Sequence, residues 1–294
     1  MNFEKTEVFN LKGAFHGMRN PKNSWDRSDS WFGIVMPDYD DGTELEVVDA
    51  WIEEENIMRR EQGKEELSHD MEDYNEYYDR LDYYANWLIQ EGQLSVCDNY
   101  HTYYNMAYLG PADLDLAQDL ILAGDEHAKF MRQIFVSVDI TAPLYWWKEM
   151  DTYKVGTTAN STSTMHKLTS KPLDMSFFEW SEFDLEIDAY TVPHGGECGL
   201  VVADYQDDIV SMCETLRQKY LETKDKRYWR ALIQILPESY LQTRTWTADY
   251  QVLRNIYFQR KNHKLIEWHK FCDWIKSLPY ANELIIIGDT NETN

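Results

Sequence analysis

The chain has 294 residues and carries 52 Asp and Glu against 28 Lys and Arg, a formal net charge of −24. This charge excludes a protein that neutralises a long stretch of nucleic acid, because the summed field repels a polyanion. Hydrophobic residues make up 43% and aromatic residues 14% of the chain, which excludes disorder along its whole length. The length predicts one large domain or two smaller ones.

The cysteines are widely separated and form no CxxC pair, which argues against a zinc knuckle and a disulfide framework. The N-terminal residues are acidic and mixed rather than basic and then apolar. No stretch approaches the roughly 18 uninterrupted apolar residues of a membrane-spanning helix. We therefore expect a soluble, cytoplasmic protein that has no membrane partner.

The N-terminal third predicts a strand, a break and then a long acidic helix. TEVFNLKGAF is typical of a strand that enters a turn or short helix, and Pro21 and Asn23 interrupt the pattern before the apolar run WFGIVM. From Val47 to about Gln90 the pattern is helical, with tyrosines at steps of three and four. We interpret these tyrosines as a packing face, because such a stripe more often fills space than holds a cofactor.

The middle of the chain predicts a helix followed by a strand. Apolar residues from Leu114 to Ile121 share one helical side, and Gly124 stands where a helix commonly ends. Val136, Val138 and Ile140 alternate as one face of a buried strand. A turn is expected at Ala142-Pro143, before two adjacent tryptophans.

The C-terminal part predicts loops and then helices. Residues 169 to 206 contain isolated prolines and glycines, so we expect loops with short strands there. Apolar residues then recur at helical spacing in four segments, which are 209–220, 229–236, 252–257 and 265–275. The C-terminal third is therefore expected to be helical.

Several common catalytic motifs are missing, namely GxGxxG, GxxxxGK[ST], HExxH and GxSxG. His263 and Glu267 lie four apart on an expected helix, and without a third ligand nearby they indicate an exposed ion pair. The segment VPHGGEC indicates a glycine turn with a surface histidine. No metal site is predicted.

A polar run between residues 154 and 166 allows two interpretations. It gathers lysine, hydroxyl and amide side chains around Gly156, a composition able to bind a phosphate or a heterocycle. Serine, threonine and asparagine clusters between periodic segments are more often solvated loops with a helix cap. Composition alone favours the loop.

Two blocks of the sequence resemble the flavin-dependent thymidylate synthase family. The run EHAKFMRQIFVSVDITAPLYWWKEMDTYKVGTTANSTSTMH is similar to that family's EHxxF segment, strand, Pro and motif RHRxxSxNExSxRY. The run LPESYLQTRTWTADYQVLRNIYFQR is similar, without a gap, to LPxxxYTxxxWTxNxRxLxxFxxLR. The two blocks keep the family's order along the chain.

The resemblance implies a role for individual residues. His127 falls on the histidine that borders the flavin, and Asn160 and Asn255 fall on flavin-contacting positions. Ser163 falls on the serine that meets the nucleotide substrate. Arg260 falls on the arginine that contacts the uracil ring and stabilises its developing negative charge.

The central motif also departs from the family. Ser161 replaces its glutamate, Met165-His166 replaces its final Arg-Tyr, and Tyr153-Lys154-Val155 replaces its leading RHR. An arginine fork is the usual bidentate phosphate ligand, and two or three arginines of the family's motif are missing, so the resemblance does not extend to the family's own set of monophosphate ligands. Lys154 and Arg244 are the residues expected to supply positive charge to the substrate in its place.

The resemblance implies an α+β fold, a mixed or antiparallel sheet flanked by helices, in a single domain over 1–294 with an acidic helical insertion at about 47–105. It implies a homotetramer, FAD as cofactor, NADPH and methylenetetrahydrofolate as further ligands, and a pyrimidine nucleotide as substrate. The expected activity is reductive one-carbon transfer to a uridine nucleotide or related pyrimidine. Two alternatives stay open: a flavoenzyme acting on another substrate, and a non-enzymatic homo-oligomeric binding or assembly protein.

Overall fold

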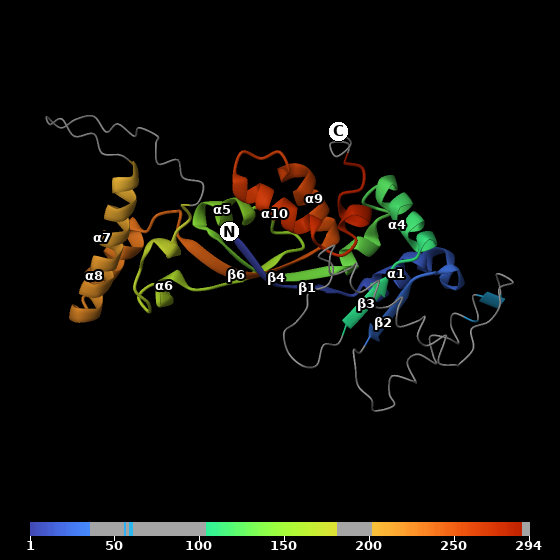
Figure 1. Cartoon of the computed structure of the whole chain (residues 1–294), viewed down its shortest axis with the longest axis horizontal. Helices are drawn as coiled ribbons and strands as arrows, with labels where there is room; N and C mark the ends of the chain where they lie inside the picture. Colours follow the sequence, from blue (N-terminus) through green and yellow to red (C-terminus); the bar gives the residue numbers. More distant parts are fainter. Residues whose placement is uncertain (36–55, 57–58, 61–103, 181–201, 290–294) are drawn as a thin grey trace, which may run out of the picture. The chain divides into compact units, whose positions relative to one another are not determined.

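The computed structural model describes residues 1–35, 56, 59–60, 104–180 and 202–289 (Figure 1). They divide into two compact units, one of Met1–Phe9 and Met131–Ile275, the other of Asn10–Phe130 and Lys276–Asn294. The expectation of a single domain with an acidic insertion stays a prediction. The tyrosine stripe of the insertion lies outside the described residues.

The first unit is built on a four-stranded sheet with strand order β1-β4-β6-β5. Its strands are β1 (Asn2–Phe9), β4 (Phe135–Pro143), β6 (Leu241–Asp249) and β5 (Thr158–Ser161). Every neighbouring pair is antiparallel. The strand expected from the alternation of Val136, Val138 and Ile140 is β4, and that prediction is confirmed.

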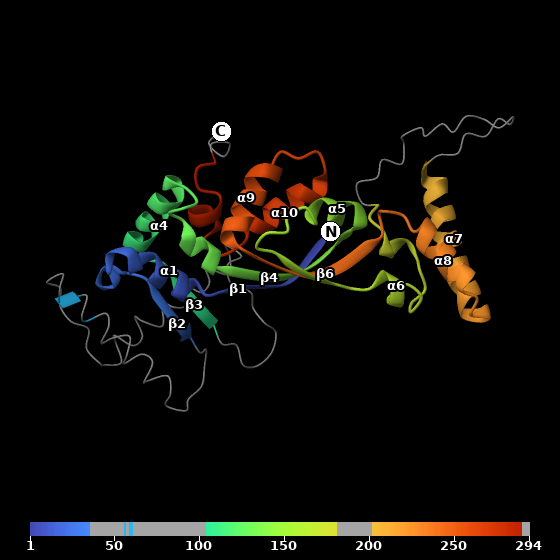
Figure 2. The same cartoon turned by 180° about the vertical axis from the view of Figure 1, so that it is seen from behind.

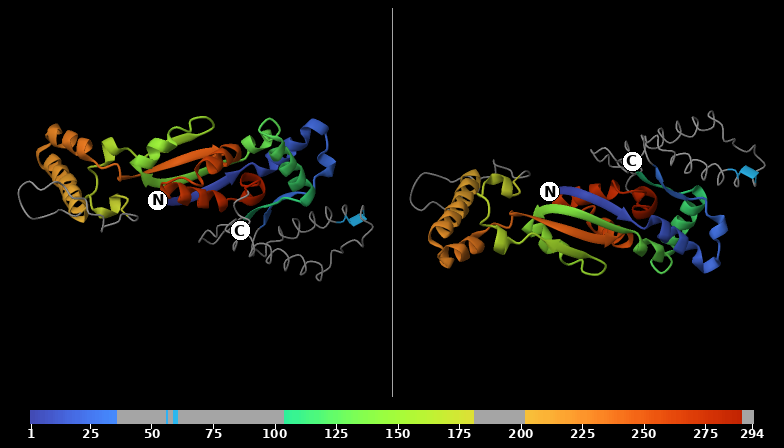
Figure 3. Two further views of the ribbon diagram at one scale, coloured as in Figure 1. Left: turned by 90° about the horizontal axis from the view of Figure 1, so that it is seen from above. Right: turned by 90° about the horizontal axis from the view of Figure 1, so that it is seen from below.

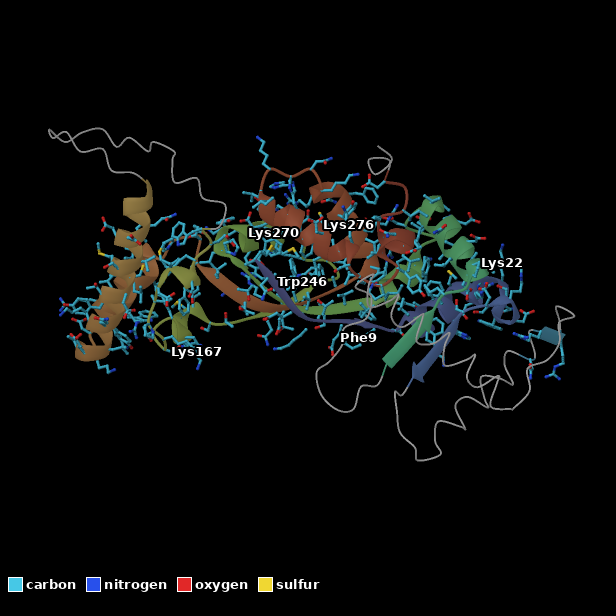
Figure 4. All side chains as sticks on the ribbon, viewed as in Figure 1. Phe9, Lys22, Lys167, Trp246, Lys270 and Lys276 are labelled. Atoms are coloured by element: carbon cyan, nitrogen blue, oxygen red, sulfur yellow. The ribbon has the colours of Figure 1, made fainter. Side chains whose placement is uncertain are left out.

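Three helices cover one face of this sheet, as Figures 1 and 2 show from opposite sides. They are α5 (Leu144–Met150), α9 (Tyr250–Arg260) and α10 (Ile266–Lys276). Val136, Val138 and Ile140 of β4 are fully buried beneath them, and Trp246 of β6, labelled in Figure 4, is 2% exposed. We call this the helix face of the sheet. The α+β class and the antiparallel sheet with flanking helices are thus confirmed.

The other face of the sheet, which we call the polar face, carries hydroxyl and carboxyl groups. Thr245 Oγ donates a hydrogen bond to Asp139 Oδ1, and Lys5 Nζ donates to Asp139 Oδ2 over 2.9 Å. The hydroxyls of Thr141 and Thr243 are 2.7 Å apart. These threonines, Asp139 and Lys5 are half-buried or exposed, and they share a face because strand residues alternate between the two faces.

The first unit also contains α6 (Thr164–Lys167), α7 (Val202–Thr223) and α8 (Lys226–Ile235). These helices enclose a small core of Leu168, Leu173, Cys213 and Leu232. The four helices expected in the C-terminal part are α7, α8, α9 and α10. The expectation of loops as far as residue 206 is wrong at its end, because α7 begins at Val202, within a run of residues that tolerate a helix.

The second unit combines helices with a two-stranded antiparallel pair. Its elements are α1 (Leu11–Arg19), β2 (Trp31–Val35), β3 (Tyr104–Tyr108), α4 (Pro111–Ala123) and a π-helical turn at Ala281–Ile285. A buried ion pair joins Arg19 Nε to Asp113 Oδ1. Gly124 follows α4 with φ of 115°, a conformation that favours glycine, which confirms the expected helix end. Among the described residues, no helix is long and apolar enough to cross a membrane.

Candidate functional site

The lengths of β6 and α9 bring two arginines to the same end of the first unit. Arg244 lies five residues before the end of β6 at Asp249, and Arg260 lies eleven residues after it. Both segments span roughly 16 Å, since a strand rises about 3.3 Å and a helix 1.5 Å per residue. Asp249 caps α9 by accepting a hydrogen bond from the Val252 amide over 2.8 Å. Both arginines therefore reach the C-terminal end of α5, and Figure 3 shows α9 and α10 lying over the sheet.

Arg260 is held in place by three side chains. Its Nη1 donates to Glu149 Oε2 over 3.0 Å, and its Nε donates to the Tyr153 hydroxyl over 2.7 Å. The guanidinium carbon lies 4.5 Å from the centre of the Trp268 ring, a distance at which cation and ring attract. The side chain is 19% exposed. Two hydrogen bonds and one ring thus fix the plane of the guanidinium.

Glu149 is the centre of this cluster. Its Oε2 also accepts a hydrogen bond from Trp268 Nε1 over 2.9 Å, and His263 Nε2 lies 3.5 Å away. The expected ion pair of His263 with Glu267 is wrong, because His263 precedes α10 and faces Glu149 instead. Glu267 is 3% exposed and accepts a hydrogen bond from the Tyr145 hydroxyl. Burial of Tyr145 is the main reason that its pKa is raised.

Arg244 repeats the arrangement with other partners. Its Nη1 donates to Asp151 Oδ1 over 2.7 Å and its Nε to Gln242 Oε1 over 3.0 Å. The guanidinium carbon lies 4.2 Å from the centre of the Trp147 ring. Gln242 is itself fixed, since its amide donates to the Thr162 carbonyl over 2.8 Å. Arg244 is 15% exposed.

A row of tryptophans connects the two arginines. The Trp147 and Trp146 ring centres are 4.9 Å apart, and those of Trp146 and Trp268 are 5.1 Å apart. Trp146 is fully buried, and its Nε1 has no acceptor among the described residues. We call the two arginines with their carboxylates and tryptophans the arginine clamps. Each clamp stands at one end of the row.

Residues 153–161 of the first sequence block lie along α9 and then along β6. Tyr153 donates to Gln259 Oε1 over 3.0 Å near the end of α9. Gly156 has φ of 74°, and a Cβ there would lie 2.9 Å from Val252 Cγ2 near the start of α9, so this position requires glycine. β5 follows and pairs with β6. The structure therefore brings the two blocks together as neighbouring segments.

The polar run forms strand β5 and the cap of helix α6, so its side chains lie on different faces. Asn160 is the register partner of Thr245, and Ser161 that of Arg244. Directly opposed residues share a face, so Asn160 belongs to the polar face and is directed away from the arginine clamps. Ser163 caps α6, since its hydroxyl accepts from the His166 amide over 3.1 Å. Part of the run is thus a strand rather than a loop, and the helix cap is present.

The other residues singled out by sequence lie elsewhere. Lys154 is exposed in the turn before β5. Asn255 is exposed on α9 and accepts a hydrogen bond from Gln251 over 3.3 Å. It lies five positions before Arg260 on the helix, which turns the two side chains about 140° apart around the axis. His127 belongs to the second unit, where it is exposed in the turn after α4.

Sequence reasoning missed the residues that hold the arginines. Glu149 and Asp151 follow the adjacent tryptophans at a spacing of two. The tryptophan pair was a visible signal, because it stands where the composition changes sharply. The pairing itself depends on strand register and helix length, which no local motif encodes.

Solved structures similar to this chain include two of flavin-dependent thymidylate synthases. No family model and no curated protein matches the sequence. One structure is the flavin-dependent thymidylate synthase ThyX from Helicobacter pylori complexed with FAD and dUMP, at 18% identity and a TM-score of 0.42, covering 60% of this chain and 83% of that chain. The other is Thymidylate Synthase X (ThyX) from the same organism with FAD and dUMP, at 19% identity and a TM-score of 0.42, covering 60% and 82%. At this level of similarity, function has to be argued from the residues of the chain itself.

Proposed function

We propose that the chain binds FAD and a pyrimidine ligand and catalyses reductive one-carbon transfer to the pyrimidine ring. The observation that carries the proposal is the position of Arg260. The sequence resemblance gives this arginine the contact to the uracil ring, and Glu149, Tyr153 and Trp268 hold it in one plane. Both N–H groups of its Nη2 have no partner among the described residues. They are available to a ring carbonyl.

The donors of this region fit the ring of a flavin or pyrimidine better than its phosphates. Planar guanidinium groups backed by tryptophan suit flat rings with carbonyl acceptors. The arginines are paired with carboxylates, which leaves Lys154 as the exposed cation of the polar run. In this proposal His127, Asn160 and Asn255 hold the flavin, as the resemblance implies, and Ser163 meets the substrate. When bound, the reduced flavin supplies the hydride.

The protein's contribution to the reaction is electrostatic. Arg260 stabilises negative charge on the ring carbonyl as the neighbouring carbon becomes nucleophilic. Donors of this kind typically contribute about 3–4 kcal/mol to the transition state. Glu149 and Tyr153 fix the guanidinium beforehand, so the arginine need not reorganise during the reaction.

A homotetramer, NADPH as reductant and methylenetetrahydrofolate as carbon donor belong to the same proposal. One chain directs Asn160 to the polar face of the sheet, whereas Arg260 lies among the helices of the other face. A site that uses both side chains therefore needs residues from more than one chain. Assembly would supply that arrangement.

The test combines a spectrum with an activity measurement. The purified protein should show the visible absorption of oxidised flavin and form thymidylate from dUMP with FAD, NADPH and methylenetetrahydrofolate. Arg260→Ala should lower kcat/KM about 100-fold or more. Arg227→Ala is the matched control, because Arg227 is a solvent-exposed arginine paired with Asp225 on α8. Full activity of Arg260→Ala would refute the role.

A second candidate is a non-enzymatic homo-oligomeric binding or assembly protein that keeps the fold. Two observations favour it. Arg244 and Arg260 are each already paired with a carboxylate, and Met165, which is 47% exposed, stands where the family motif has an arginine. This candidate predicts a colourless protein that associates in sedimentation experiments and fails to rescue a thymidine-requiring strain. Rescue would exclude it.

A further inference from the structure

We infer that Glu149 and Asp151 set the ligand class of the site: they convert two arginines from phosphate anchors into donors for an uncharged, carbonyl-bearing pyrimidine. The inference deepens the proposed function and rests on it for the identity of the ring. The claim about charge rests on the arginine clamps alone.

The two clamps follow one design. In each, Nε donates to a neutral oxygen, which is the Tyr153 hydroxyl for Arg260 and the Gln242 amide for Arg244. In each, Nη1 donates to a carboxylate from the C-terminal end of α5 or the residue after it. In each, the guanidinium lies over a tryptophan ring. Only Nη2 keeps both of its N–H groups without a partner among the described residues.

Because of these contacts, a phosphate that binds bidentately has to compete with partners that each guanidinium already has. A guanidinium binds an oxyanion bidentately through two neighbouring N–H groups on the same edge. The first edge consists of Nε and Nη2, and Nε already donates to a neutral oxygen; the second consists of Nη1 and Nη2, and Nη1 already donates one of its two N–H groups to a carboxylate. A bidentate phosphate on the first edge displaces Tyr153 or Gln242. One on the second edge lies beside the carboxylate of Glu149 or Asp151, which repels it. A single carbonyl oxygen needs only Nη2.

The charges around the two arginines also favour an uncharged ligand. Each arginine has its own carboxylate partner, so the two clamps together carry no net charge. Lys148, the lysine of α5, is paired with Glu238 over 2.6 Å. The chain as a whole carries −24, and that field repels an added dianion. An uncharged ring is not repelled by this field, so it binds at these arginines with a smaller electrostatic cost than a phosphate.

The preferred ligand is therefore a pyrimidine at the level of the nucleoside, whose ring supplies the recognition. A 5′-phosphate adds little affinity at these arginines. Glu149 and Asp151 act as specificity-determining residues, because they decide which charge the arginines accept.

The experiment compares 2′-deoxyuridine, its 5′-monophosphate and inorganic phosphate, by calorimetry and by the fluorescence of the tryptophans in the arginine clamps. The wild-type chain should bind the monophosphate no more tightly than the nucleoside and should show no saturable binding of inorganic phosphate. Glu149→Gln/Asp151→Asn keeps oxygen acceptors for the arginines and removes two negative charges. In this variant, affinity for the monophosphate relative to the nucleoside should rise about tenfold or more, equivalent to about 1.4 kcal/mol. Salt-sensitive binding of inorganic phosphate should appear.

The control is Glu222→Gln/Asp208→Asn, which makes the same change in net charge at exposed positions of α7. It should behave as the wild type. The single variants Glu149→Gln and Asp151→Asn, with thermal unfolding of each protein, repeat the comparison if the double variant is unstable. A tenfold wild-type preference for the monophosphate, or a double variant with unchanged phosphate binding, overturns the inference. Absence of flavin and pyrimidine binding removes the proposed function, and the inorganic phosphate arm still decides the role of the carboxylates.

Discussion

The two faces of the four-stranded sheet share one backbone but differ in the burial and the chemistry of their side chains. The helix face carries buried aromatic rings and the arginine clamps, whereas the polar face carries threonines and Asp139. Consecutive residues of β6 show the contrast, since Trp246 is buried and Thr245 is exposed. Side chains one residue apart in a strand serve different surfaces. Residues of one motif therefore share a site only if they also share a face.

The largest expected difference between the faces lies in stability. Trp246→Ala should lower the free energy of unfolding by about 3–5 kcal/mol, because a buried aromatic side chain leaves a cavity. Thr245→Ala, on the neighbouring residue, should change it by about 0.5 kcal/mol. Urea denaturation of both variants measures the contrast. Equal losses would show that the polar face is as tightly packed as the helix face.

Substitutions of Asp249 test how much the helix cap between β6 and α9 contributes to stability. Asp249→Ala should lower the free energy of unfolding by about 1–2 kcal/mol, because the Val252 amide loses its acceptor. Asp249→Asn keeps the acceptor and should stay within about 0.5 kcal/mol of the wild type. Thermal and urea unfolding at neutral pH distinguish the two substitutions. A loss with asparagine as large as with alanine would show that the charge itself is needed.

The same residue predicts a pH dependence. Burial raises the pKa of Asp249 above its ordinary value. The folded chain therefore binds this proton more tightly than the unfolded chain, so the associated stabilisation is present at low pH and is lost as pH rises through the folded pKa. Asp249→Asn should lack this dependence when the unfolding free energy is compared across acidic pH.

The smallest expected effect lies on the polar face. The hydrogen bond from Thr245, with a second from Lys5, holds the pKa of Asp139 below its ordinary value. The resulting stabilisation is present above the pKa of an unfolded aspartate and is lost as pH falls through the lower folded pKa. Thr245→Val should move the pKa of Asp139 upward. NMR titration of this carboxyl group measures the shift, and an unchanged pKa would assign it to Lys5.

Much of the fold follows from the periodicity of the sequence. The alternation of Val136, Val138 and Ile140 predicted β4, because only one side of that strand faces the helices. The spacing of apolar residues predicted α7 to α10 for the same reason. The second compact unit could not be predicted, since its boundaries depend on contacts between distant segments. The early start of α7 lacked a periodic signal.

The site was only partly accessible from sequence. Arg260 was identified through the resemblance, whereas Glu149 and Asp151 were not. These two carboxylates pair with the arginines only because β6 and α9 place Arg244 and Arg260 beside the C-terminal end of α5. Asn160, in contrast, was identified from the motif, but the face of the sheet on which it lies depends on its register with Thr245, which the motif does not encode. Local patterns predict elements, and the pairing of elements decides which side chains meet.

The matched lengths of β6 and α9 restrict how this region can vary. One residue inserted between Arg244 and Asp249 would move Arg244 to the opposite side of the sheet. One residue inserted within α9 would rotate Arg260 by about 100° around the helix axis. A substitution between residues 244 and 260 leaves the spacing of the two arginines unchanged, whereas a single insertion or deletion separates a guanidinium from its carboxylate. We expect relatives that keep both clamps to differ here in residue type but not in residue count.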